Sequence, residues 1–167
     1  MRGHDLPDAA HKLAGEAEEV LNLAYDRSLK IATAESCTGG LLASLLTDIE
    51  GRSSSFERGF VTYSGESKKA LLGLPADKVA ENEAVNAEVA RQMAEGALQR
   101  SKADIALSVT GFAGPGGPDD EEGLVFMACA RRGRPTQIEE RHYGPIGRGA
   151  VRIEALKTLL DMLEEAF

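Results

Sequence analysis

The chain has 167 residues, of which 43% are hydrophobic, enough for one globular domain with a sizeable core and too few for two ample ones. Its 19 Lys and Arg against 27 Asp and Glu give a net charge of −8, which disfavours nucleic acid or an anionic membrane as partner and favours a small molecule. Two cysteines are too few for a disulfide scaffold or closed zinc site, and no run approaches the roughly 18 apolar residues of a membrane span, so we expect a cytoplasmic protein, neither secreted nor membrane-spanning.

Helices and strands are expected to alternate along the chain. Hydrophobic residues at helical spacing predict helices over 8–26, 41–49, 65–72, 86–100 and 147–166. Apolar and β-branched runs predict strands over 30–34, 56–64, 103–111, 124–132 and 136–144. This alternation favours a single layered α/β domain over 1–167, with the last two strands adding an antiparallel hairpin.

Several common catalytic and cofactor motifs are absent. The sequence has no G-x-G-x-x-G, no phosphate loop ending in Gly-Lys-Ser/Thr, and no G-x-S-x-G nucleophile elbow. Two of its three histidines, His4 and His11, lie in the polar N-terminal segment, so a histidine-based triad is not expected. No His, Cys and carboxylate cluster has the spacing of metal ligands. Neither a metal nor a cofactor is therefore predicted.

The segment TAESCTGG, residues 33–40, is the first candidate site. It places Ser36 between a strand and a helix, the usual ligand position in α/β sheets, where free backbone N–H groups can hold a phosphate or an oxyanion. Gly39 and Gly40 would allow close approach of a ligand. The alternative is structural: Ser36 or Thr38 is an N-cap and Glu35 a solvated acid of the first helical turn.

A serine nucleophile needs a base, and the segment TYSGESKKALLGL offers a lysine and a phenol. If Ser64 caps a helix there, Lys68 lies on its apolar face, where partial desolvation would lower the lysine pKa into the range of a general base. The alternatives are that Lys68 extends to solvent and that Tyr63 is a packed aromatic residue.

Two later segments could bind an anion. A strand that ends in Thr110 opens into the glycine- and proline-rich sequence GFAGPGG, whose backbone N–H groups could hold a phosphate or a ribose. The terminal helix begins with Arg148 and carries Arg152 one turn later, and an anionic ligand would stabilise a cation at that helix end. Ordinary turns and exposed arginines paired with acids such as Glu154 are the structural alternative.

Together, the segments TAESCTGGLLASLLT, GFVTYSGESKKALLGL, VTGFAGPGG and GRGAVR resemble the CinA C-terminal domain, or PncC, family of nicotinamide mononucleotide amidohydrolases. The resemblance spans about residues 8–166. It implies a three-layer α/β/α sandwich with a mixed, mostly parallel sheet. It also implies hydrolysis of the nicotinamide carboxamide to nicotinate mononucleotide and ammonia, without metal. Many family members carry an additional N-terminal domain. This sequence does not contain that domain, so we expect the chain to act alone or as a homo-oligomer.

The resemblance also assigns roles to individual residues. It implies that Ser36 is the nucleophile and that Lys68, directly or through Tyr63, removes its proton. Backbone N–H groups from Cys37 to Gly40 become candidate oxyanion donors. The expected substrate-binding residues are Glu35, Cys37, Thr38, Gly39, Gly40, Thr110, Gly111, Gly114, Gly116, Gly117 and Arg148. The rival interpretation is a non-catalytic nucleotide-binding or regulatory module of the same fold.

Overall fold

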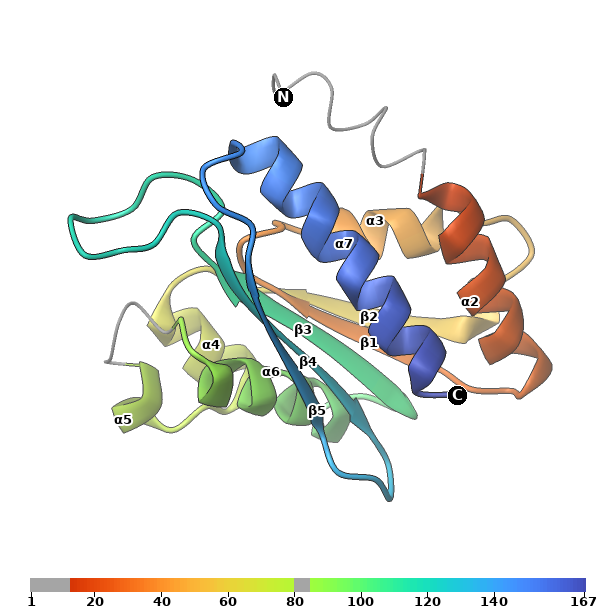
Figure 1. Cartoon of the computed structure of the whole chain (residues 1–167). Coiled ribbons are helices and arrows are strands. Elements are labelled where there is room, and N and C mark those ends of the chain that lie inside the picture. Colours follow the sequence, from red (N-terminus) through yellow and green to blue (C-terminus); the bar gives the residue numbers. More distant parts are fainter. Residues whose placement is uncertain (1–12, 80–84) are drawn as a thin grey trace.

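A five-stranded sheet with helices on both faces forms the molecule (Figure 1). The computed structural model describes residues 13–79 and 85–167, so the first residues of the helix predicted over 8–26 lie outside the described part. The elements in chain order are α2 (Ala14–Asp26), β1 (Ile31–Glu35), α3 (Leu41–Thr47), the 3₁₀ helix η2 (Ser53–Ser55), β2 (Phe56–Val61), α4 (Gly65–Leu72), α5 (Ala76–Val79), α6 (Ala87–Gln99), β3 (Ile105–Gly111), β4 (Leu124–Arg131), β5 (Gln137–His142) and α7 (Arg148–Glu165).

The strand order is β2-β1-β3-β4-β5. β1 pairs in parallel with both β2 and β3, whereas β3–β4 and β4–β5 are antiparallel, so four of the five strands run in one direction. The mixed, mostly parallel sheet expected from the sequence is confirmed. β1 and β3 are buried on both faces, which explains why apolar residues occur on both sides of each strand instead of alternating with polar ones.

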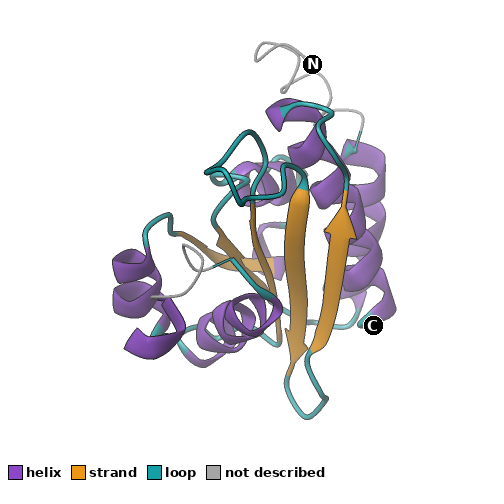
Figure 2. Cartoon of the chain, turned by 60° about the vertical axis from the view of Figure 1, so that its left-hand side comes forward, coloured by secondary structure: helices purple, strands orange, loops and turns teal. Residues whose placement is uncertain are grey.

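The two faces of the sheet are covered by different helices (Figures 1 and 2). α2, α3 and α7 pack on one face, against a cluster that includes Ile31, Leu107 and Met127. α4, α5 and α6 lie on the other, where small residues such as Ala32 and Ala106 face α6. These three layers confirm the α/β/α sandwich.

Helix capping occurs where the sequence predicts it. The Ser64 side chain accepts a hydrogen bond from the backbone N–H of Ser67 at the start of α4, and Asn86 accepts one from the N–H of Val89 at the start of α6. α4 ends at Gly73, which has a left-handed conformation with φ of +72°. The one-turn helix α5, just after Pro75, was not predicted.

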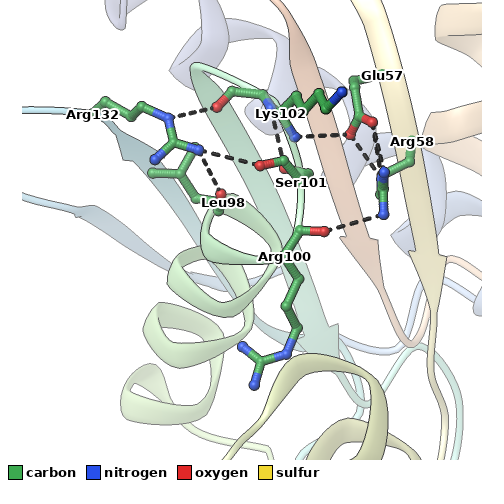
Figure 3. A network of polar contacts seen from close by, with 8 residues as sticks. Glu57, Arg58, Leu98, Arg100, Ser101, Lys102 and Arg132 are labelled. Carbon is green, nitrogen blue, oxygen red and sulfur yellow. Dashed lines mark hydrogen bonds and ion pairs between the residues drawn. The ribbon is translucent and has the colours of Figure 1, made fainter.

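Arginine side chains close the carboxyl end of α6 (Figure 3). Arg132 donates hydrogen bonds to the carbonyl groups of Leu98, Ser101 and Ala103, and Arg58 donates one to the carbonyl of Arg100. These bonds satisfy carbonyl groups that the helix end leaves without partners. These bonds lie near the start of β3. The arginines therefore stabilise the fold at the end of the sheet that is opposite to the carboxyl ends of the parallel strands.

Candidate active site

The topology creates a crevice at the carboxyl ends of β1 and β3. From β1 the chain passes through α3 on one face of the sheet to β2, and from β2 it returns through α4, α5 and α6 on the other face to β3. Such a reversal of direction leaves an open position between the two strands, where ligands bind in α/β sheets. A cavity of about 490 Å³ lies here, lined by Ser36, Cys37, Tyr63, Ser64, Gly65, Lys68, Val79, Val85, Gly111, Phe112, Ala113, Gly114, Pro115, Gly116 and Arg148.

Ser36 and Lys68 meet in this cavity. Lys68 Nζ donates a hydrogen bond of 3.0 Å to Ser36 Oγ and a second, of 2.8 Å, to the backbone carbonyl of Tyr63. The serine comes from the end of β1 and the lysine from the second turn of α4, which is 32 residues later in the chain. A hydroxyl group and an amine at this distance have the geometry that a nucleophile and its general base require.

Lys68 is buried although it is a lysine. Only 1% of its surface is exposed, so the alternative that its side chain extends to solvent is wrong. Burial disfavours the ammonium form and lowers the pKa of Lys68, while the nearby Cys37 acts in the opposite direction. A larger neutral fraction is what a general base requires.

Tyr63 contributes to the site mainly through its backbone. Its side chain lines the rim of the cavity but is 78% exposed, whereas its carbonyl group accepts the hydrogen bond from Lys68. Its N–H donates to Ser67 Oγ, which fixes the turn before α4. The contact between Lys68 and Ser36 is direct, so the geometry favours proton transfer without the phenol.

Glu35 shapes the loop that carries Ser36. Its carboxylate is fully buried and accepts hydrogen bonds from the hydroxyl of Thr38 and the N–H groups of Gly40, Leu42 and Ala43. The side chain thus caps α3 from the preceding strand, a role that the sequence analysis missed. The structural alternative that Glu35 is a solvated acid is wrong, because its side chain is buried. The alternative that Ser36 or Thr38 is the N-cap is also wrong, because the N-cap residue of α3 is Gly40.

The loop leaves two backbone N–H groups available. Those of Gly39 and Gly40 donate to the Ser36 carbonyl and the Glu35 carboxylate. No acceptor in another described residue pairs with the N–H groups of Cys37 and Thr38, and the Cys37 N–H lies against its own thiol. Of the four amides expected as oxyanion donors, these two are the ones without an acceptor in another described residue.

The thiol of Cys37 is not a second nucleophile. Burial raises its pKa to about 12, and the positive charge of Arg152 opposes this effect only in part. A thiol with that pKa is almost entirely protonated at neutral pH. The Cys37 side chain therefore serves as packing, and its role in the site lies in its backbone.

Arg148 and the glycine-rich loop form the other wall of the cavity. The guanidinium group lies so close to Gly114 that a Cβ atom there would approach Arg148 Nη2 to 2.8 Å. Within 13–79 and 85–167, no side chain or carbonyl pairs with this guanidinium group, and Glu154 pairs with Lys157 instead. Arg148 thus brings a positive charge without a partner in the described part of the chain to the lining of the cavity that also contains Ser36.

Comparison with known proteins identifies the family. The CinA C-terminal domain matches this sequence over residues 14–167. The chain belongs to the CinA family. CinA-like proteins of Akkermansia muciniphila and Geobacter sulfurreducens are 47% and 46% identical to it over alignments of 141 and 146 residues, and the alignments cover 81% and 86% of this chain. They are longer proteins, and the chain spans about a third of the length of the curated relatives it matches.

Solved structures of CinA proteins have the same fold. The competence/damage inducible protein CihA of Agrobacterium tumefaciens is 40% identical, with a TM-score of 0.81, 99% of this chain and 96% of that chain being covered. The competence damage-inducible protein A of Klebsiella pneumoniae is 32% identical, with a TM-score of 0.83 and coverage of 93% and 95%. The architecture described above is thus that of the CinA superfamily.

The site of this CinA protein contains part of the residue set expected from the sequence. Ser36, Cys37, Tyr63, Lys68, Gly111, Gly114, Gly116 and Arg148 line the cavity. Other expected binding residues lie outside its lining, namely Glu35, Thr38, Gly39, Gly40, Thr110 and Gly117. Thr110 is fully buried at the end of β3, and the Gly117 N–H is engaged by the carboxylate of Asp120. The apolar lining from Val79, Val85 and Phe112 was not predicted, because no motif marks residues that contact a cavity only through packing.

The described residues contain no group of three or more His, Cys, Asp or Glu side chains that could hold a metal ion. None of their helices has the length and apolar character needed to cross a membrane.

Proposed function

We propose that this protein is an amidohydrolase that converts nicotinamide mononucleotide to nicotinate mononucleotide and ammonia, with Ser36 as nucleophile and Lys68 as general base. The observation that carries this proposal is the 3.0 Å contact between Lys68 Nζ and Ser36 Oγ inside a cavity. The lowered pKa of Lys68 supports it. The choice of substrate follows the resemblance to the family.

The first half of the reaction forms an acyl-enzyme. In its neutral form, the amine of Lys68 can accept the Ser36 hydroxyl proton through its lone pair while still donating to the Tyr63 carbonyl. Ser36 Oγ then attacks the carboxamide carbon, and the carbonyl oxygen becomes an oxyanion. The C–N bond breaks as the Lys68 ammonium group returns the proton to the departing nitrogen, so that ammonia leaves and an ester on Ser36 remains.

The second half regenerates the enzyme. Water attacks the ester carbon while Lys68 takes one of its protons. The bond to Ser36 Oγ breaks, Lys68 protonates that oxygen, and the second proton of the water is released to solvent as nicotinate mononucleotide leaves in its carboxylate form. The N–H groups of Cys37 and Thr38 are the candidate donors to the oxyanion in both halves.

Arg148 is the proposed phosphate ligand. Its guanidinium group lines the cavity, lacks a protein partner among the described residues, and stands at the first position of the 18-residue helix α7. A phosphate there would form charge-assisted hydrogen bonds and benefit from the positive end of the helix dipole. The cavity volume of about 490 Å³ suits a mononucleotide.

The test is ammonia release from nicotinamide mononucleotide by the wild type, Ser36→Ala and Lys68→Met. We expect turnover by the wild type only, and hydroxylamine should trap a nicotinoyl group from the wild type during turnover. Ser54→Ala, at an exposed serine of η2, is the matched control and should retain full activity. Equal rates for the wild type and Ser36→Ala would refute the serine mechanism. A wild type that binds the nucleotide without releasing ammonia would instead favour the non-catalytic binding module.

A further inference from the structure

Arg152 bonds to the loop that carries the nucleophile, although 115 residues separate the two in the chain. Its Nε donates a hydrogen bond of 2.7 Å to the backbone carbonyl of Cys37. Arg152 is half-buried on α7, one turn after Arg148, yet it does not line the cavity that contains Ser36. It lines a separate hollow, together with Thr38, Gly39, Gly40, Leu41 and Ser44.

This hydrogen bond fixes the direction of a peptide group next to the nucleophile. In a trans peptide, the C=O of one residue and the N–H of the next point in opposite directions. Because Arg152 holds the Cys37 carbonyl, the N–H of Thr38 is directed away from Arg152. In the same way, the Gly39 N–H holds the Ser36 carbonyl and so directs the N–H of Cys37 away from that turn.

Successive N–H groups with fixed directions and no acceptor in another described residue are the kind of backbone donors that can bind an anion. The Ser36–Cys37 peptide is fixed by the turn itself. The Cys37–Thr38 peptide is fixed by Arg152, because Glu35 holds only the later part of the loop, from Thr38 to Ala43. The cation also polarises the peptide group, which strengthens its N–H as a donor.

We propose that Arg152 is a positioning residue, which holds the Cys37–Thr38 peptide so that its N–H stabilises the oxyanion formed when Ser36 reacts. This inference rests on the proposed serine mechanism and adds to it a residue that touches neither substrate nor base. Its role is separate from that of Arg148, which lies on the same helix but faces the cavity.

The first experiment measures kcat and KM for ammonia release by Arg152→Gln and Arg152→Lys. Removing one oxyanion donor costs about 100- to 1000-fold in kcat, and loosening a donor costs less, so we expect a loss of about 10- to 100-fold in kcat for Arg152→Gln with little change in KM. Arg152→Lys should recover part of it, since it retains the charge. Lys157→Gln removes an exposed cation from the same helix and should leave both constants unchanged.

A second measurement does not depend on the identity of the substrate. A fluorophosphonate probe reacts with activated serines, and intact mass gives its rate of addition to Ser36. We expect Arg152→Gln to slow this addition in parallel with kcat, and guanidinium ion to restore part of the rate in Arg152→Ala, because the hollow beside Arg152 is open to solvent. Sodium chloride at the same ionic strength should not restore it. Lys68→Met should react with neither probe nor substrate, with or without guanidinium.

The outcomes separate this inference from the proposed function. Wild-type activity with an unchanged kcat for Arg152→Gln would overturn the positioning role and leave the amidase intact. Labelling of Ser36 without ammonia release would overturn the proposed substrate, and the labelling rates alone would then decide the role of Arg152. The positioning role would also be overturned if Arg152→Gln had a lower kcat together with a melting temperature well below that of the wild type, and guanidinium did not rescue Arg152→Ala. A wild type that neither reacts with the probe nor releases ammonia would overturn both.

Discussion

Replacing Glu35 with alanine is expected to destabilise the protein strongly, because its side chain holds the loop between β1 and α3. Its carboxylate is fully buried and accepts four hydrogen bonds. Two of the donors, the Thr38 hydroxyl and the Leu42 N–H, are buried, whereas those of Gly40 and Ala43 are partly exposed and water can replace their acceptor.

The magnitude follows from these donors. A hydrogen bond to a charged group contributes about 1.5–3 kcal/mol, so two buried donors without an acceptor give a loss of about 3–6 kcal/mol for Glu35→Ala. Glu35→Gln can keep its oxygen at the position of Oε2, which accepts three of the four bonds. Its amide nitrogen then lies opposite the Ala43 N–H, and both groups are hydrogen-bond donors. We therefore expect Glu35→Gln to lower the free energy of unfolding by about 1–3 kcal/mol.

Urea unfolding followed by circular dichroism measures both losses. Glu18→Ala, at an exposed position of α2, is the matched control and should change the free energy of unfolding by less than about 0.5 kcal/mol. Since domains of this size are stable by about 5–15 kcal/mol, the expected loss is easily resolved. If Glu35→Ala unfolded within about 1 kcal/mol of Glu18→Ala, the reasoning that these buried donors depend on Glu35 would be refuted.

The remaining predictions concern the catalytic cavity. Because the pKa of Lys68 is lowered and its neutral form is the base, kcat/KM should rise with pH through a value below that of an ordinary lysine; a profile limited only by a carboxylate, flat from pH 5 upward, would contradict this. Tyr63→Phe should lower kcat by less than about tenfold, because the backbone carbonyl that binds Lys68 remains; a loss as large as that of Lys68→Met would assign the proton transfer to the phenol. Arg148→Gln should raise KM for the mononucleotide about 10- to 100-fold and leave the weaker turnover of nicotinamide riboside unchanged, since only the former has a phosphate. Iodoacetamide should leave native Cys37 and Cys129 unmodified, as judged by mass spectrometry, because burial raises the pKa of both thiols to about 12; rapid alkylation of either would show an exposed thiolate.

Local sequence patterns predicted most of the elements and one half of the site. The caps at Ser64 and Asn86 depend on side chains that bond to the backbone three residues later, so a short segment contains all the information they require. Helical spacing placed Lys68 on the inner face of α4, where it is buried beside Leu72. The same face is not covered throughout, since 48% of the surface of Leu71, one residue before Leu72, is exposed.

The sequence by itself therefore determined the alternation of helices and strands, the capped start of α4 and the serine at the end of β1, because each depends on neighbours within a few residues. Only the tertiary structure decided the distance between Lys68 and Ser36, the burial of Glu35 and the bond from Arg152 to Cys37. Glu35 looks like a solvated acid until β1 is buried on both sides, and Arg152 looks like a surface cation until α7 packs beside the nucleophile loop. The chemistry of each residue type was readable from the chain, but its environment depends on which distant segments the folded sheet brings together.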